Sequence, residues 1–287
     1  MKSLAFIHRN DTRFAVGDFS PVLSVFSYNE LGNTVSPFLL LDHIGPGKLL
    51  PSERPGGVNE HPHRGFETVT IVYKGELEHR DSSGGGGLIG AGDVQWMTAA
   101  SGVIHRELFS PAFTKAGGPF EMVQLWVNLP AADKMNPPRY QNLTRASIPV
   151  VDLPDKAGTV RVIAGTFSGV SGPALTHSRM QLLDVRLSAG HSARFATEDG
   201  DTALVYLLAG KLQLSADEEA LEEQAMAVMS SLGADVQVTA TEDSRFLVLS
   251  GAPFHEPING HGPFVMNTYE EILQAYDDIK TGRFAKP

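Results

Sequence analysis

Short stretches in which apolar and polar residues alternate recur along the chain, separated by glycines and polar residues. Phe66–Tyr73 is rich in β-branched and aromatic residues, and Met122–Leu129 alternates between apolar and polar side chains. Residues two apart share one face of a strand, so both stretches predict β-strands. Glu76–Asp81 predicts a further strand, residues 88–97 predict a turn leading into another, and the glycine-rich Ser82–Gly87 predicts a loop. Many short strands at this spacing are typical of a β-sandwich or barrel.

A second block with the same strand rhythm follows a polar stretch, Asp133–Ser147, which contains Pro137-Pro138 and is typical of a linker. The strands predicted in the second block are Val160–Phe167, Gln181–Leu187, Thr202–Leu214 and Ser244–Leu249. Glu218–Met229 is ambiguous between a helix and a pair of strands. The pattern therefore favours two domains, 1–135 and 136–287, related by a diverged duplication.

The end of the chain carries the one clear helical pattern. Thr268 is followed three residues later by Glu271, which is a capping-box pair. Ile272, Tyr276 and Ile279 recur at helical spacing, and Gly282 is a typical residue just beyond a helix end. A helix over Thr268–Gly282 is therefore predicted within the second domain.

Composition and charge exclude several classes of protein. The 287 residues include no cysteine, so disulfides and zinc–thiolate sites are excluded and any transition metal must be held by His, Asp or Glu. A net charge of −10 argues against direct contact with nucleic acid. No apolar run reaches the roughly 18 residues of a membrane span, and the apolar stretch at the N-terminus is too short for a signal peptide. A cytoplasmic protein is expected, or a nuclear one in a eukaryote.

Two pairs of candidate metal ligands share the same spacing. His61 and His63 are two apart, as are His105 and Glu107. On strands, each pair points to one face, so neighbouring strands in a barrel would bring three imidazoles and one carboxylate together. Such a donor set suits a divalent ion of the group Fe(II), Mn, Co, Ni, Cu and Zn. Four protein ligands on a six-coordinate ion leave two positions for chemistry.

The sequence around these pairs resembles the cupins and, within them, the pirin family. The His-x-His pair is followed by Glu67 and Gly75, as in the first cupin motif. Gly102 and His105 keep part of the second motif, which here lacks its proline and has Phe109 in place of asparagine. A Glu two residues after that histidine is a pirin feature. Similarity to pirins extends over nearly the whole chain, in the segments 37–43, 61–69, 95–99, 124–129 and 261–268.

The resemblance implies an all-β bicupin, with two cupin barrels face to face and the C-terminal helix. It implies one metal, iron in the first instance, at His61, His63, His105 and Glu107 of the N-terminal barrel. It also implies one of two functions. The first is quercetin 2,3-dioxygenase-type cleavage of a flavonol with O2, and the second is iron- and redox-dependent regulation of a protein partner without turnover. A third reading is a metalloenzyme with another substrate.

The chemistry of a flavonol fits two open positions, because its adjacent hydroxyl and keto oxygens can chelate a metal. Metal binding would lower the pKa of the hydroxyl, and a nearby carboxylate, Glu107 or Glu67, could take the proton. We therefore assign Glu107 as the catalytic candidate and favour a supporting role for Glu67.

Other residues favour structural readings. Asp42 and His43 are favoured as a satisfied buried polar pair over a pocket wall, and Trp96 and Trp126 as core residues over a stacking platform. The second block has no His-x-His or Gly-x-x-His-x-Glu pattern around its histidines, so a metal-free second barrel is expected. Those histidines are His177, His191, His255 and His261.

Overall fold

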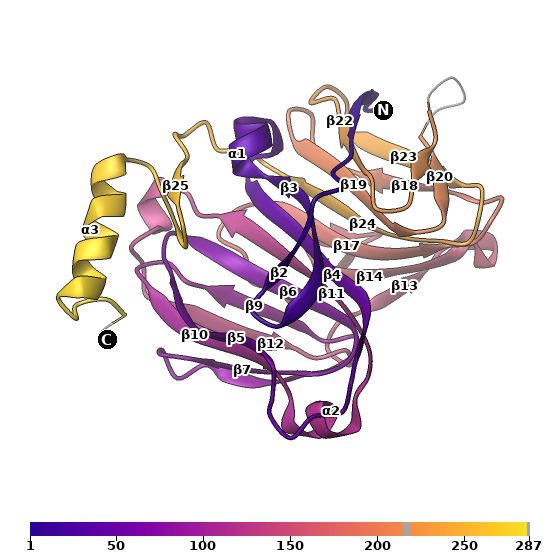
Figure 1. Ribbon diagram of the computed structural model, residues 1–287. Coiled ribbons are helices and arrows are strands. Elements are labelled where there is room, and N and C mark those ends of the chain that lie inside the picture. The colour runs from indigo at the N-terminus through magenta and orange to yellow at the C-terminus, as the bar shows by residue number, and fades with distance from the viewer. Residues whose placement is uncertain (215–218, 286–287) are drawn as a thin grey trace. The chain divides into compact units, whose positions relative to one another are not determined.

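The structure is a computed structural model that describes residues 1–214 and 219–285. Its contacts divide the chain into two compact units, each built mainly of antiparallel strands (Figure 1). We call the unit formed by residues 11–32, 38–145 and 255–285 the first barrel. The unit formed by residues 1–10, 33–37 and 146–254, less 215–218, is the second barrel. No described helix is long and apolar enough to cross a membrane.

The first barrel consists of a seven-stranded sheet and a four-stranded sheet. The larger has the order β12-β9-β6-β11-β4-β3-β2, and the smaller has the order β5-β10-β7-β8. The bounds of the strands are β2 Arg13–Val16, β3 Phe19–Ser27, β4 Phe38–Leu49, β5 Gly57–His63, β6 Phe66–Lys74, β7 Leu77–Asp81, β8 Gly86–Ile89, β9 Val94–Thr98, β10 Val103–Phe109, β11 Gly118–Asn128 and β12 Arg139–Leu143. A β25–β26 hairpin (Asn259–His261, Phe264–Met266) and the helices α1 (Tyr28–Leu31), α2 (Pro111–Ala116) and α3 (Tyr269–Lys280) complete it.

Alternation along β6 explains how the larger sheet faces two environments. Val72 belongs to an apolar cluster inside the barrel, together with Ile44 and Met122 of the neighbouring strands. Thr68 and Thr70 share the face of Val72, whereas Glu67, Val69 and Ile71 face the other side. Both faces of β6 are buried up to Val72, which fits the strand's β-branched and aromatic composition.

The second barrel repeats the strand order of the first. Its larger sheet is β1-β22-β19-β24-β17-β14-β13 and its smaller sheet is β18-β23-β20-β21. The bounds are β1 Leu4–His8, β13 Val150–Asp152, β14 Gly158–Ala164, β17 Met180–Leu187, β18 Ser192–Ala196, β19 Thr202–Ala209, β20 Lys211–Gln213, β21 Leu221–Glu222, β22 Met226–Met229, β23 Asp235–Ala240 and β24 Ser244–Gly251, with a small β15–β16 hairpin (Thr166–Phe167, Val170–Ser171). Short 3-10 turns occur at Gly32–Val35, Ala131–Asp133 and Pro154–Lys156. By strand order, β18 and β23 correspond to β5 and β10.

Apolar side chains line the second barrel at β18 and β23. Ala193 and Phe195 of β18 and Val236 and Val238 of β23 are buried in one cluster. These strands correspond to β5 and β10 of the first barrel, which carry His61, His63, His105 and Glu107. An apolar interior gives a physical reason to expect no metal there, and this expectation remains a prediction.

The compact units do not follow the expected boundary at residue 135. The N-terminal β1 pairs with β22 and so belongs to the second barrel. The expected linker contains β12, which pairs with β9, and residues 255–285 pack in the first barrel. Pairing between strands distant in sequence decides these assignments, and such pairing leaves no local signal.

The C-terminal helix has the predicted cap. The Thr268 hydroxyl accepts a hydrogen bond from the Glu271 amide (3.2 Å), and the Glu271 carboxylate accepts one from the Thr268 amide (2.9 Å). Of the ambiguous stretch Glu218–Met229, Glu218 lies outside the described residues. The rest contains two strands, β21 and β22, so the strand reading applies there.

Candidate metal centre

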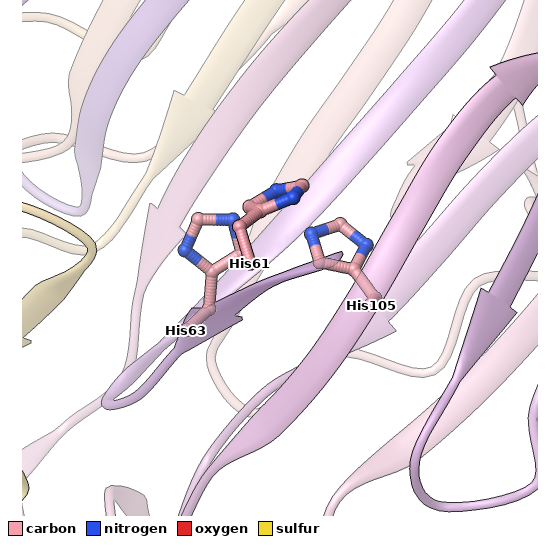
Figure 2. Close-up of side chains that lie close together, drawn as sticks. All are labelled: His61, His63 and His105. Carbon is pink, nitrogen blue, oxygen red and sulfur yellow. The ribbon is translucent and has the colours of Figure 1, made fainter. Parts of the chain in front are cut away.

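The three predicted histidine ligands lie on two paired strands of the smaller sheet. His61 and His63 alternate along β5 with Pro62 between them, and His105 lies on β10. The strands are antiparallel and His105 pairs directly with His61. One potential ligand nitrogen from each ring lies within 4.8 Å of the others, and the three rings form one group (Figure 2). The three histidines singled out by their spacing therefore lie together in the structure.

Hydrogen bonds at Nδ1 leave the Nε2 atom of each ring available. Nδ1 of His61 lies 2.7 Å from the Asn59 carbonyl oxygen, and Nδ1 of His63 lies 3.2 Å from that of Pro263. A carbonyl only accepts, so both Nδ1 atoms carry the proton and both Nε2 atoms carry a lone pair.

His105 differs because its Nδ1 contacts another imidazole, Nε2 of His79, at 2.9 Å. Nε2 of His105 is buried and has no hydrogen-bond partner among the described residues. A buried polar atom without a partner is costly unless a ligand completes it. This atom, beside two other imidazoles, fits a divalent metal.

Burial keeps the imidazoles of His63 and His105 neutral. Removal from water lowers the pKa of His63 to about 3, and the nearby His61 adds to the shift. Burial also lowers the pKa of His105 well below its usual range, with His63 and His61 as further causes. Neutral imidazole is the form that binds metals, so both rings are ready to do so at neutral pH.

Glu107, the predicted fourth ligand, is buried on β10 beside this group but its oxygens are not among the clustered atoms. Its Oε1 accepts a hydrogen bond from the Thr70 hydroxyl (3.2 Å) and its Oε2 accepts one from the Gln124 amide (3.0 Å). These contacts hold the carboxylate in place while leaving further lone pairs on each oxygen.

Glu67 lies on the other face of the large sheet. It lies three positions before Thr70 along β6, so the two side chains face opposite sides, and it accepts a hydrogen bond from the Thr98 hydroxyl at 2.6 Å. Since Thr70 contacts Glu107, Glu67 points away from the histidines. This position agrees with the supporting role favoured from the sequence.

A cavity of about 290 Å³ adjoins the histidines inside the first barrel. That volume is just below the usual range for small-molecule sites. His61, His63, Glu107, Thr70, Gln124 and Asp42 supply its polar lining, and Val16, Phe19, Val22, Ile44, Val58, Leu77, Met122 and Trp126 supply its apolar walls. A larger recess of about 580 Å³ lies along β7 and β8, but none of the four proposed ligands lines it.

Comparison with known proteins identifies the family. The pirin family model matches residues 20–127, and the model of the pirin C-terminal cupin domain matches residues 182–285. A Pseudomonas aeruginosa protein named "Putative quercetin 2,3-dioxygenase" is 53% identical over 286 residues, 100% of this chain and 99% of that one. Pirin of Homo sapiens is 38% identical over 260 residues, 88% of this chain and 84% of that one. The chain belongs to the pirin family.

Similarity to a solved structure agrees with this assignment. The crystal structure of quercetin 2,3-dioxygenase from Acinetobacter baumannii matches this pirin with a TM-score of 0.96 at 47% identity, covering 99% of this chain and 98% of that one. The predicted family is therefore confirmed. So is the predicted all-β fold of two cupin domains with a short C-terminal helix.

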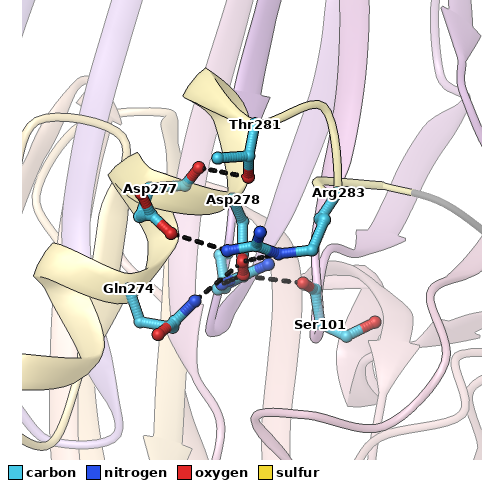
Figure 3. Close-up of polar contacts among 7 residues, drawn as sticks. Ser101, Gln274, Asp277, Asp278, Thr281 and Arg283 are labelled. Atoms are coloured by element: carbon cyan, nitrogen blue, oxygen red, sulfur yellow. Dashed lines mark hydrogen bonds and ion pairs between the residues drawn. The ribbon is translucent and has the colours of Figure 1, made fainter.

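The C-terminal segment of this pirin attaches to the loop after His63. The Arg64 guanidinium donates to the Asp278 carboxylate of α3 (2.8 Å) and to the Ser101 carbonyl (2.7 Å), and it lies over the Phe284 ring. Figure 3 shows Asp278 at the centre of this group, with Gln274 and Arg283 also donating to it. Arg64 therefore forms a buried ion pair with α3.

A buried lysine strengthens the same attachment. The Lys134 ammonium donates to the carbonyl oxygens of Gly65 (2.6 Å) and Val265 (2.9 Å) and to the Asn128 side chain (2.6 Å). All three donors of the ammonium are therefore used. Together with the His63–Pro263 contact, these bonds fix β26 against the end of β5 and the loop that follows it.

Two structural readings from the sequence need correction. Asp42 and His43 are not a pair: neighbours on β4 face opposite sides, and His43 lies 3.5 Å from Glu121 whereas Asp42 lines the cavity. Trp126 also lines the cavity, 5.3 Å from His63 between ring centroids, while Trp96 is fully buried as expected. His177, His191, His255 and His261 are not part of the histidine group.

Sequence reasoning missed His79, Thr70 and Gln124. His79 is buried and stacks on Tyr140, with centroids 5.0 Å apart. The one local signal is a polar residue at an inward position of each strand, at 70, 79 and 124. Alternation identifies such positions, but strand register decides which of them reach the site.

Proposed function

We propose that this pirin is a metal-dependent dioxygenase that cleaves a flavonol in the manner of a quercetin 2,3-dioxygenase. A single metal would be held by His61, His63, His105 and Glu107. The observation that carries the proposal is the buried, unpartnered Nε2 of His105, set beside two imidazoles at the wall of a cavity. The names of the Pseudomonas and Acinetobacter relatives support the same reaction class.

The donor set guides the choice of metal. Three imidazole nitrogens and one carboxylate suit Fe(II), which we propose first, and would also accept Mn, Co, Ni, Cu or Zn. An ion at this position would supply Lewis acidity toward a substrate hydroxyl and a redox couple for O2 chemistry.

The residues around the ion would hold and deprotonate the substrate. The Glu107 carboxylate, fixed by Thr70 and Gln124, would accept the proton of a flavonol hydroxyl. The apolar walls, which include Val22 and Met122, would hold the aromatic ring and exclude water from the reacting end.

Metal reconstitution tests the proposal. Protein loaded with Fe(II) without oxygen is mixed with quercetin and oxygen, and oxygen uptake and carbon monoxide release are followed. We expect one metal per chain, with His61→Ala losing it. His191→Ala is the matched control, because Nδ1 of His191 also lies near the carbonyl two residues before it, at 3.1 Å. Two tightly bound metals per chain, or full loading of a His61→Ala/His105→Ala variant, would contradict the site.

A second candidate function is an iron- and redox-dependent regulator that binds a protein partner. One observation favours it: His63 is tied through Pro263 to the segment that carries α3, where Tyr269 and Leu273 are exposed by 60% and 51%. A change in the oxidation state of the metal could thus alter the position of the exposed apolar side chains of α3. Fully Fe(II)-loaded protein that consumes no oxygen with any flavonol would favour this function.

A further inference from the structure

A row of polar side chains crosses the inner face of the large sheet in the first barrel. Ser24 pairs with Asp42, Asp42 with Gln124, Gln124 with Thr70, and Thr70 with Gln95. Directly paired residues of neighbouring strands point to the same face, so these side chains form one continuous row over β3, β4, β11, β6 and β9. The rest of this interior near the cavity is largely apolar, so the row is a distinct feature.

The middle of the row is occupied by contacts to Glu107. Thr70 and Gln124 each donate to one oxygen of that carboxylate. Asp42 is next along the row and lines the same cavity as His61 and His63. Its oxygens are not among the atoms clustered within 4.8 Å, so the carboxyl stands apart from the proposed ligand nitrogens.

Asp42 has unused hydrogen-bonding capacity. The Ser24 hydroxyl donates to the carboxyl, but Oδ1 is buried and has no hydrogen-bond partner among the described residues. The residue is 8% exposed. Leaving a buried carboxyl oxygen without a partner is costly, so a group that enters the cavity and hydrogen-bonds Oδ1 would be bound favourably. Burial also raises the pKa of Asp42 to about 7, so both protonation states are accessible near neutrality.

We propose that Asp42 is a substrate-positioning residue that hydrogen-bonds a hydroxyl group of the substrate remote from the metal-binding oxygens. The inference rests on the proposed function. It narrows the substrate class to polyhydroxylated aromatics with polar groups at two separate places. One end meets the histidines and Glu107, a second hydroxyl meets Asp42, and apolar walls such as Val22 and Ile44 hold the ring between them. A site built to bond a hydroxyl discriminates strongly against an analogue that lacks it.

The test is a binding cycle with two flavonols. Quercetin carries several hydroxyls, whereas 3-hydroxyflavone carries only the chelating one. Dissociation constants are measured by calorimetry on zinc-loaded protein, which binds without turnover, for wild type, Asp42→Ala and Asp42→Asn. Glu67→Gln is the matched control, because it changes a buried carboxyl on the opposite face of the same sheet.

We expect wild type to prefer quercetin and Asp42→Ala to lose about 10- to 100-fold of that preference, with its 3-hydroxyflavone affinity unchanged. Asp42→Asn, which keeps the shape and an oxygen acceptor, should lose less than about 10-fold, and it serves as the test if the alanine variant fails to fold. Glu67→Gln should keep the full preference. An unchanged preference in Asp42→Ala overturns the role of Asp42 and leaves the proposed function standing. Failure of wild type to bind either flavonol overturns both.

Discussion

Nδ1 of His105 lies 2.9 Å from Nε2 of His79, and both rings are fully enclosed in the first barrel. If Nε2 of His105 binds a metal, the imidazole proton of His105 must be on Nδ1. Nε2 of His79 must then accept a hydrogen bond from that N–H group. His79 thereby fixes the tautomer in which His105 can act as a ligand. Outer partners of this kind orient metal-binding histidines.

Removing the acceptor at His79 should weaken the site. We expect His79→Phe to lower metal affinity by about 10- to 100-fold, because the Nδ1 proton of His105 loses its partner. His79→Gln offers an amide oxygen and should retain more affinity. A chelator competition titration measures both, and Tyr140→Phe, which keeps the ring stacked on His79, is the control. Equal affinities for wild type and His79→Phe would show that His79 has no such role.

Substitutions of Glu107 and Glu67 should have different effects on metal binding and turnover. Glu107→Gln removes the charge beside the histidines, so we expect weaker metal binding and lost oxygenase turnover even with excess metal. Glu67→Gln alters the other face of the sheet and should keep the metal. Elemental analysis and oxygen uptake check both variants. If Glu67→Gln empties the site and Glu107→Gln leaves it filled, the fourth ligand has been assigned to the wrong carboxylate.

Ionisation of Asp42 should make stability depend on pH. Burial raises its pKa in the folded protein from the usual 3.8 to about 7. Below about pH 4 the carboxyl is protonated in both states, so its burial carries no charge penalty. Between about pH 4 and 7 only the unfolded chain releases the proton, so the free energy of unfolding falls as pH rises.

The Asp42→Asn variant has no carboxyl to titrate at this position, so this fall in the free energy of unfolding should be absent from it. At about 1.4 kcal/mol per pKa unit, the free energy of unfolding of the variant should rise relative to that of wild type by up to about 4 kcal/mol between pH 4 and 7. Urea unfolding of the metal-free proteins at several pH values measures the difference. A difference between the two proteins that stays constant with pH would rule out a raised pKa at this residue.

Two glycines with the same backbone angle offer a controlled test of the attachment of β26. Gly65 has φ +90° and Gly84 has φ +88°. A Cβ at Gly65 would collide with the Val265 carbonyl oxygen, whereas one at Gly84 meets nothing within 4 Å. Backbone strain should cost each alanine variant roughly 1–2 kcal/mol of stability.

Only Gly65→Ala should also lower metal affinity, because it displaces β26 and with it the Pro263 carbonyl that orients His63. Thermal unfolding and chelator competition report the two effects separately. Equal metal affinities in the Gly65→Ala and Gly84→Ala variants would show that the position of β26 does not affect metal binding.

The sequence allowed prediction of the features that are encoded locally. The alternation of Phe66–Tyr73 and the capping box at Thr268 act within a few residues, and the His-x-His spacing needs only a strand to group its rings. Asp42 and His79 depend instead on register between strands, which brings residues far apart in sequence together. The make-up of the compact units depends on register in the same way, because β1 and α3 each pack with chain from the other half of the sequence.

The hydrogen bond between His63 and the Pro263 carbonyl spans 200 positions of the chain. During synthesis, all four proposed ligands leave the ribosome long before the residue that orients one of them exists. Stalled or shortened translation products would carry the ligands without the finished site. If the proposed ligands bind a metal, the site that holds it is therefore finished only after Pro263 has been made.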